Sequence, residues 1–378
     1  MKKILITGGA GFIGSNLCLK LVEKNYKVTV IDSLSEQIHG SNPLINSALY
    51  NSVKDKIVFI YDTILNPESI EKAIGDNEII VHLAAETGTG QSMYDIHNYV
   101  NVNSTGTALL LDILANKKNS VKKLIVSSSR ALYGEGKYLN SKNEAVYPLA
   151  RLDTNMEKGI FDPIDLETNQ KLKLVATDEL SKIHPSSVYG ITKQNQEDLI
   201  MTVCPTIGIS PVALRYQNVY GAGQSLKNPY TGILSIFSNL IRQYKPINIF
   251  EDGLESRDFV YIDDVVDATI LAIENEKSNN QIFNVGTGRA NTVIEVAQTL
   301  IKNYSITVDL NITGNYRLGD IRHNFADITK IKSMLGFMPK VSFETGIDKF
   351  TKWVLSQEVE QDLYEKSLME LKSKGLLK

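Results

Sequence analysis

The chain has few cysteines and no cluster of metal-ligating side chains. Its 378 residues include two cysteines, Cys18 and Cys204, and five histidines that are scattered along the sequence. Neither cysteine has the spacing of a metal ligand, and no two histidines form a convincing ligand pair. We therefore expect two reduced packing cysteines and no metal site.

Long apolar runs and basic runs are missing as well. No stretch reaches the ~18 apolar residues of a membrane span, and the N-terminus lacks the long apolar region of a secretory signal. The net charge is −3, and no stripe of lysine and arginine is present that could bind nucleic acid. These absences predict a soluble, cytoplasmic protein that binds neither membranes nor nucleic acid.

Apolar runs that are typical of buried strands alternate with helical periodicity in the first part of the chain. This alternation predicts βαβ crossovers and a doubly wound parallel sheet, which is an α/β fold of the Rossmann type. The strand runs cover residues 3–6, 27–31, 57–61, 79–83, 123–127 and 212–216. Helical patterns cover residues 68–75, 98–116, 188–203, 232–243, 293–303 and 355–377, the last as a polar surface helix.

A glycine-rich turn directly follows the first strand. Gly8, Gly9, Gly11 and Gly14 stand between the apolar run 4–6 and a helical pattern. Glycines permit a tight turn and a close approach of the backbone to a pyrophosphate, and the helix N-terminus supplies free N–H groups and a favourable dipole. The pattern therefore predicts a dinucleotide-binding turn.

Asp32 selects the cofactor. It ends the second strand run, where a carboxylate can accept hydrogen bonds from an adenosine ribose. A carboxylate at this place repels a 2′-phosphate, and residues 33–40 contain no arginine or lysine that could bind one. NAD is therefore expected rather than NADP.

Tyr189 and Lys193 stand four residues apart in a predicted helix, so both side chains lie on one face. A phenol has an ordinary pKa of about 10, which is too high for a base at neutral pH. A nearby ammonium and the positive nicotinamide ring favour the phenolate, which predicts a lowered pKa for Tyr189. Ser127 and Ser129 end a central strand, at the edge where ligands of open α/β sheets bind.

Residues 135–188 break the alternation of strands and helices, because charges of both signs are frequent there and periodic apolar positions are sparse. We expect a surface insertion that serves as a lid or a subunit contact and depends on a ligand or a neighbouring subunit for order. The chain should divide into an NAD-binding domain over 1–217, which carries the insertion, and a smaller α/β substrate-binding lobe over 218–354. Within the latter range, 257–287 should return to the NAD-binding domain, and 355–378 should form a C-terminal helix.

Seven short motifs are spread over most of the chain. They are TGGAGFIG at 7–14, HLAA at 82–85, SSSRALYG at 127–134, YGITK at 189–193, RYQNVYG at 215–221, RDFVYIDD at 257–264 and RLGD at 317–320. Together they make the chain similar to extended short-chain dehydrogenases/reductases of the nucleotide-sugar epimerase/dehydratase group. The resemblance covers nearly everything except residues 135–188.

The resemblance implies roles for individual residues. Ser129 would hydrogen-bond to the reacting hydroxyl, Tyr189 would act as acid and base, and Lys193 would activate it and bind a ribose. Asp62 would hold the adenine amine. The implied NAD-binding residues are Gly8, Gly11, Phe12, Ile13, Gly14, Asp32, Asp62, Thr63, Leu83, Ala84, Ala85, Ser127, Tyr189, Lys193 and Tyr216. The implied substrate-binding residues are Thr87, Ser129, Arg130, Asn218, Arg257 and Arg317, the last three at the diphosphate.

One departure from the group bears on the reaction. Sugar 4,6-dehydratases of this group carry an Asp-Glu pair after the catalytic hydroxyl residue, where this chain has Arg130 and Ala131. Without that pair the elimination of water lacks its acid and base, so a 4-epimerase is expected. The stretches 84–92 and 228–232, with the long insertion, resemble dTDP-L-rhamnose 4-epimerase-like enzymes most, and the chain is similar also to UDP-glucose 4-epimerases.

The expected activity is epimerisation of a nucleoside-diphosphate sugar at C4 through a transient 4-keto sugar, with tightly bound NAD and a dTDP-6-deoxyhexose or UDP-hexose as substrate. A 4-ketosugar reductase with exchangeable NAD(P)H would use the same residues. A non-catalytic dinucleotide-binding regulator on the same fold is the third reading, against which the intact Ser129, Tyr189 and Lys193 argue. A homodimer is expected.

Overall fold

Seven parallel strands form the central sheet of the computed structural model, which describes residues 2–226, 228, 232–359 and 364–378. Every pair of neighbouring strands in this sheet runs parallel, which confirms the expected doubly wound fold. The strands, from one edge to the other, are β14 (Gln281–Val285), β9 (Ser210–Tyr216), β5 (Lys123–Ser129), β4 (Ile79–His82), β1 (Lys3–Thr7), β2 (Lys27–Asp32) and β3 (Val58–Tyr61). Pro229, Tyr230 and Thr231, within the stretch 228–232 noted above, lie outside the described residues.

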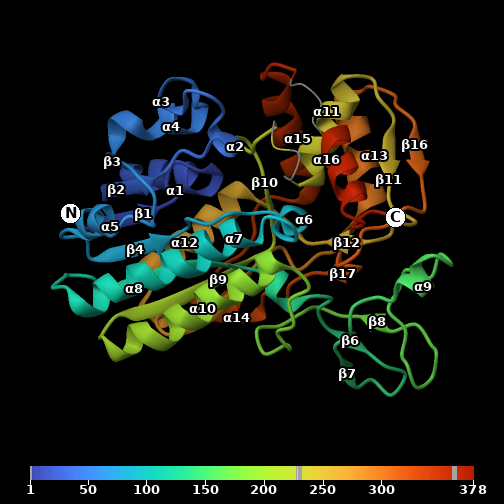
Figure 1. Cartoon of the computed structure of the whole chain (residues 1–378), viewed down its shortest axis with the longest axis horizontal. Helices are drawn as coiled ribbons and strands as arrows, with labels where there is room; N and C mark the ends of the chain where they lie inside the picture. Colours follow the sequence, from blue (N-terminus) through green and yellow to red (C-terminus); the bar gives the residue numbers. More distant parts are fainter. Residues whose placement is uncertain (1, 227, 229–231, 360–363) are drawn as a thin grey trace.

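Two helical layers cover the two faces of this sheet (Figure 1). Side chains alternate along each strand, so Ile4 and Ile6 of β1 join the apolar cluster on one face while Leu5 joins the cluster on the other. The helices of the first face are α1 (Phe12–Glu23) and α12 (Ile262–Glu274), and those of the second are α5 (Pro67–Ile74), α8 (Gly106–Asn116) and α10 (Val188–Thr206).

Short helices occupy several connections. They are α2 (Glu36–His39), α3 (Pro43–Asn46), α4 (Ala48–Val53), α6 (Thr89–Ser92) and α7 (Ile96–Tyr99), with a π-helical turn at Val100–Thr105 and 3₁₀ turns at Lys54–Lys56, Arg130–Tyr133 and Glu276–Ser278. The helix predicted over 98–116 is therefore divided into α7, the π-helical turn and α8.

The order of the strands reverses between β1 and β4. The chain moves from β1 through β2 to β3 in one direction, and from β4 through β5 and β9 to β14 in the other. Adjacent loops at the carboxyl ends of β1 and β4 consequently lead to opposite faces of the sheet and leave a crevice between them. The glycine turn after Thr7 and the HLAA motif, which begins at His82, meet at this crevice.

A smaller lobe adjoins the carboxyl edge of the sheet. It contains the strand pairs β10 (Asn218–Tyr220) with β13 (Phe259–Tyr261) and β11 (Ile247–Ile249) with β16 (Leu310–Ile312), and the three-stranded sheet of β15 (Asn291–Thr292), β12 (Ser256–Arg257) and β17 (His323–Asn324). Its helices are α11 (Ile233–Arg242), α13 (Val293–Tyr304), α15 (Phe343–Leu355) and α16 (Tyr364–Ser373), while α14 (Thr329–Leu335) contacts β14.

The insertion 135–188 has little secondary structure. It forms an antiparallel sheet of β7 (Ala145–Val146), β6 (Tyr138–Leu139) and β8 (Lys173–Leu174), and the short helix α9 (Asp153–Met156). Met156 and Phe161 are buried against Tyr316 of the lobe, so the apolar cluster under the insertion is shared between the two. In addition, Arg151 forms buried ion pairs with Glu135 and with Glu251 of the lobe, at 3.3 and 2.8 Å. These contacts within one chain are a source of order that the sequence expectation did not include.

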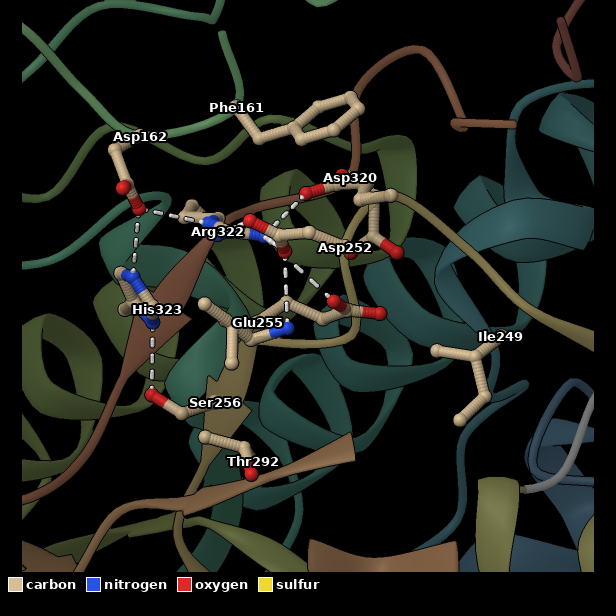
Figure 2. Close-up of polar contacts among 12 residues, drawn as sticks. Phe161, Asp162, Ile249, Asp252, Glu255, Ser256, Thr292, Asp320, Arg322 and His323 are labelled. Carbon is tan, nitrogen blue, oxygen red and sulfur yellow. Dashed lines mark hydrogen bonds and ion pairs between the residues drawn. The ribbon is translucent and has the colours of Figure 1, made fainter. Parts of the chain in front are cut away.

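Arg322 also connects the insertion with the lobe through ion pairs. Its guanidinium is fully buried and lies 2.9 Å from Asp162 of the insertion, 2.8 Å from Glu251 and 2.7 Å from Asp252. Figure 2 shows His323 beside it, also turned towards Asp162, at 3.3 Å. The hydrogen bond with His323 and the contacts with Arg322 outweigh burial and hold the pKa of Asp162 well below its usual range.

The C-terminal part differs from the expected surface helix over 355–377. Helix α15 ends at Leu355, and the next described helix, α16, begins at Tyr364. Ser367 and Leu371 of α16 are buried while Glu365, Lys366, Met369 and Lys372 are exposed, so the helix is amphipathic and packs one face against the molecule. Over the residues the structure describes, no helix is long and apolar enough to cross a membrane.

Replacing Arg322 with methionine should destabilise the fold by about 3 kcal/mol, because breaking a buried ion pair leaves its partner charges uncompensated. Urea unfolding of the purified protein measures this change. Arg289 is exposed, so Arg289→Met is the matched control and should leave the free energy of unfolding within about 0.5 kcal/mol of the original. Equal unfolding midpoints for the two variants would contradict the anchoring function of Arg322.

Candidate active site

The backbone of the glycine turn packs so closely against neighbouring backbone that Gly8 and Gly14 leave no room for a side chain. Gly8 has φ +71°, and a Cβ there would lie 2.8 Å from the backbone nitrogen of Ala84. A Cβ on Gly14 would lie 2.3 Å from the carbonyl oxygen of Gly8. Helix α1 begins at Phe12 without a side-chain cap, so its first N–H groups remain available to an anion. This cradle fits a dinucleotide pyrophosphate.

A cavity of about 440 Å³ opens in front of this turn. All fifteen residues that the resemblance implied for NAD line it, from the glycine turn through Asp32 and Asp62 to Tyr216. Thr87, which was expected at the substrate, also lines this cavity. The fold thus brings residues at or after the ends of β1, β2, β3, β4, β5 and β9, together with residues of α10, to one cavity.

Asp32 ends β2, which β4 and β1 separate from β5 and its Ser129. Its two carboxylate oxygens accept hydrogen bonds from the backbone N–H groups of Leu34 and Ala10, both at 2.9 Å. His39 lies 4.0 Å away, but burial lowers its pKa, so it is neutral and adds no cation at neutral pH. The Asp32 carboxylate is thus held by two backbone N–H groups at the place where the preference for NAD is expected to be set.

Tyr189 and Lys193 project from the first turns of α10. Ser187 caps this helix by accepting a hydrogen bond from the N–H of Gly190, at 3.1 Å. The Lys193 ammonium donates to the carbonyl oxygen of Ser127 at 2.8 Å and to the side-chain oxygen of Gln196 at 2.9 Å. Burial lowers the pKa of Lys193 to about 7.

The acidity of Tyr189 differs from the expectation. Burial raises its pKa, and a hydrogen bond with Ser129 and the charge of Arg130 act in the opposite direction. The Lys193 ammonium is turned towards Ser127 and Gln196. Arg130 is therefore a cation near the phenol that the sequence reasoning had considered only as a substrate ligand.

A second cavity, of about 320 Å³, adjoins the first, and Ser129 and Tyr189 line both. Four of the expected substrate ligands, Arg130, Asn218, Arg257 and Arg317, line only the second. The two residues that would act on a hydroxyl thus stand at the junction between a cofactor-shaped cavity and a cationic one.

Three arginines give the second cavity its charge. The Nε of Arg130 donates to the side-chain oxygen of Asn218 at 2.9 Å, and burial, together with the charge of Arg257, lowers the pKa of Arg130 to about 9. Arg317 stacks over the ring of Phe250 at 4.8 Å, and its buried Nε has no hydrogen-bond partner within the described part of the chain. Repulsion among these guanidinium groups is relieved when an anion binds between them.

Arg257 is more tightly held than the other two arginines. Its two terminal nitrogens donate to the carbonyl oxygens of Ser256, Ile321 and Arg322 and, at 3.0 Å, to the carboxylate of Asp320. Burial acts to raise the pKa of Asp320, but the surrounding arginines, Arg257 first, outweigh it and lower that pKa. Arg257 therefore supports the walls of the cavity in addition to carrying charge.

Sequence reasoning missed several residues of this cavity. Phe250 and Glu255 precede Arg257 in the sequence and line this cavity with it. Tyr364, Ser367 and Leu371 of α16 also line the cavity, and no local pattern indicates that they do.

Comparison with known proteins agrees with this geometry. The sequence model of the family described as GDP-mannose 4,6 dehydratase matches residues 5–149. The sequence model of the NAD dependent epimerase/dehydratase family matches residues 168–286. A protein of Burkholderia thailandensis named dTDP-L-rhamnose 4-epimerase is 35% identical over 95% of this chain and 96% of its own length. The chain belongs to the NAD-dependent epimerase/dehydratase family.

Other proteins that are similar to this chain are also named as epimerases. A putative UDP-glucose 4-epimerase of Methanocaldococcus jannaschii is 31% identical over 93% of this chain and 98% of its own length. The crystal structure of UDP-glucose 4-epimerase from Thermotoga maritima with UDP-glucose has a TM-score of 0.76 at 30% identity, covering 93% of this chain and 98% of that one. UDP-glucuronic acid 4-epimerase of Bacillus cereus, crystallised with UDP-glucuronic acid and NAD, has a TM-score of 0.75 at 28% identity, covering 93% and 99%.

Asp32→Ala combined with Ser33→Arg should move the preference of this site from NAD towards NADP. The change removes the anion that repels a 2′-phosphate and supplies a cation that binds one. Isothermal titration of both dinucleotides measures the preference, with Ser33→Arg alone as the control that keeps the carboxylate. An unaltered preference in the double variant would show that Asp32 does not contact the adenosine ribose.

Proposed function

We propose that the protein epimerises a nucleoside-diphosphate sugar at C4, using tightly bound NAD and a transient 4-keto sugar. The observation that carries this proposal is the position of Ser129 and Tyr189 at the junction of the two cavities. A hydroxyl held there is within reach of an acid-base pair on one side and of a dinucleotide on the other. The names of the relatives support the same activity.

In the proposed reaction, Tyr189 takes the proton of the C4 hydroxyl and later returns it, while Ser129 holds that hydroxyl by a hydrogen bond. Bound NAD supplies a reversible hydride acceptor. Arg130 stabilises the phenolate electrostatically, in agreement with its lowering effect on the pKa of Tyr189. Arg130 and Ala131 also stand where a dehydratase would carry its Asp-Glu pair, so elimination of water is not supported.

The cations of the second cavity would hold the diphosphate. Asn218, Arg257 and Arg317 are proposed as its ligands, since a guanidinium fits a phosphate with two parallel hydrogen bonds. The nucleobase of the substrate is then directed towards Phe250 and Asn248, at the part of the cavity formed by the lobe. We propose a dTDP-6-deoxyhexose as the first substrate to test and a UDP-hexose as the second, following the relatives' names.

We also propose that residues 1–217 and 257–287 form the NAD-binding domain and that the rest of 218–354 forms the substrate-binding lobe, with Arg257 contributing to the substrate site from the boundary between them. We propose in addition that the protein is a homodimer located in the cytoplasm. The direct test of the function is whether the purified protein retains NAD and converts dTDP-L-rhamnose or UDP-glucose to its C4 epimer without added cofactor. A reaction that proceeds only with added NADH or NADPH would favour a 4-ketosugar reductase instead.

Tyr189→Phe should retain the fold and bound NAD but lose turnover by ~10²–10⁴-fold, which is the usual contribution of general acid-base catalysis. Progress curves followed by NMR of the sugar measure this loss. Tyr244 is exposed, and Tyr244→Phe is the matched control that should keep full activity. Activity of Tyr189→Phe close to that of the control would contradict the mechanism.

Arg317→Ala should weaken nucleotide-sugar binding by ~1.5–3 kcal/mol, since a charge-assisted contact is removed, and should leave the melting temperature almost unchanged. Arg257→Ala should weaken binding and lower the melting temperature as well, because its guanidinium also holds three carbonyl groups and Asp320. Titration with UDP and dTDP, paired with thermal unfolding, separates the two effects. A loss of NAD binding in Arg317→Ala would indicate that this residue supports the fold instead.

A further inference from the structure

The C-terminal segment reaches the substrate cavity from outside the motifs of the family. Tyr364, Ser367 and Leu371 of α16 line the cavity that contains the three arginines, and Ser367 and Leu371 are 3% and 5% exposed. No described residue of 364–378 lines the cofactor cavity. In Figure 1 helix α16 lies over the lobe beside α11, with α6 next to it. The segment is thus placed to act on one ligand and not on the other.

Helix α16 spans the cavity from the lobe to the loop after β4. Leu371 is a spatial neighbour of Gly90, since its Cδ2 atom lies 3.8 Å from the position that a Cβ at Gly90 would occupy. Next to it, the phenol of Tyr94 donates a hydrogen bond to the carboxylate of Glu370 at 3.3 Å. These contacts attach the helix to the α6 segment, two residues from the cavity-lining Gly88. The helix therefore forms a wall between the two sides of the cavity.

The chain turns back at the end of α16 towards Arg317. Gly375 has φ +69°, and hydrogen bonds run from its N–H to the carbonyl of Lys372 and from the N–H of Leu376 to that of Leu371. This pair of bonds is the Schellman arrangement that ends a helix and reverses the chain. The residues that follow are consequently directed along the edge of the lobe.

The last residues pair with the backbone on both sides of Arg317. Tyr316 and Lys378 exchange two backbone hydrogen bonds, at 2.9 and 3.0 Å, and the N–H of Leu318 donates to the carbonyl of Leu376 at 3.0 Å. Arg317 itself stands opposite Leu377 in this antiparallel bridge. Without the tail, the N–H groups of Tyr316 and Leu318 would lose their partners, and the direction of the Arg317 side chain would be less fixed.

The tail is also fastened to the insertion. The ammonium of Lys378 forms an ion pair with Asp153, and the phenol of Tyr316 donates to the same carboxylate at 2.5 Å. Tyr316 is buried between the insertion and the lobe, so tail, insertion and the Arg317 segment form one connected unit. The far end of the tail is therefore anchored independently of α16.

We propose that residues 364–378 belong to the substrate-binding site, with α16 as a wall of the sugar-nucleotide cavity and residues 376–378 as the strand that positions Arg317. Arg317 contacts the diphosphate, and the tail acts through it as a positioning element. The inference rests on the proposed function for the identity of the ligand. A helix that only completed the fold would affect both ligands equally, whereas this segment touches the walls of one cavity.

Deletion of residues 375–378 tests the positioning of Arg317. Titration of the NAD-containing protein with UDP and with dTDP should show binding weakened about tenfold, while the bound NAD remains unchanged. The same deletion in an Arg317→Ala background should weaken binding by less than about twofold, because the two changes remove one interaction. A full tenfold loss in that background would overturn the positioning role, since the tail would then act independently of Arg317.

A pair of substitutions on α16 tests the wall and does not depend on the deletion variant folding. Leu371→Ala should raise the KM for the sugar nucleotide several-fold with kcat nearly unchanged. The control Met369→Ala, which changes a side chain that is 65% exposed, should leave both KM and kcat unchanged. Unchanged KM in Leu371→Ala would overturn this part of the proposal. If the full chain binds UDP or dTDP and the shortened chain binds them as tightly, only the inference fails. If the full chain binds neither, the proposed function itself fails.

Discussion

The close packing of the β1–α1 turn against the end of β4 is the constraint on which the site depends. Gly8 approaches the backbone of Ala84 so closely that a side chain cannot be accommodated, and Gly14 meets the carbonyl of Gly8 in the same way. This packing leaves the N-terminus of α1 uncovered at the point where the strand order reverses. The cofactor cavity opens in front of that uncovered helix end.

Charge is distributed differently in the two cavities. The cofactor cavity is lined by the acidic residues Asp32, Asp62 and Glu86, and the uncapped N-terminus of α1 offers N–H groups to it. The adjoining cavity concentrates Arg130, Arg257 and Arg317 with only two acidic residues among its described lining, Glu255 and Asp320. The first arrangement favours a ribose hydroxyl next to a pyrophosphate, and the second favours a diphosphate with its sugar directed at Tyr189. Two ligands of similar charge are thereby kept apart.

The insertion and the C-terminal tail support the cationic cavity from behind. Arg322 lies between Asp162 and Asp252 (Figure 2) and also pairs with Glu251. Arg151 connects Glu135 with Glu251, so buried ion pairs hold the insertion against the lobe. Buried charges of this kind are weak evidence for stability but fix geometry, because few arrangements satisfy all of them. The segments that differ most from a minimal Rossmann fold are thus connected to the residues proposed to bind the substrate.

The sequence by itself determined the sheet and the glycine turn, because these follow from local patterns, and its resemblance to a family implied fifteen of the residues that line the cofactor cavity. Strand runs, helix starts and short motifs place Gly8, Asp32, Ser129 and Tyr189 at the carboxyl ends of strands, and parallel strands bring those ends together. The tertiary structure alone decided that Arg130 lies near enough to Tyr189 to lower its pKa while the Lys193 ammonium turns towards Ser127, since this depends on where two flexible side chains turn. It also decided the placement of α16 and of the tail beside Arg317, because contacts between residues far apart in the chain leave no local pattern.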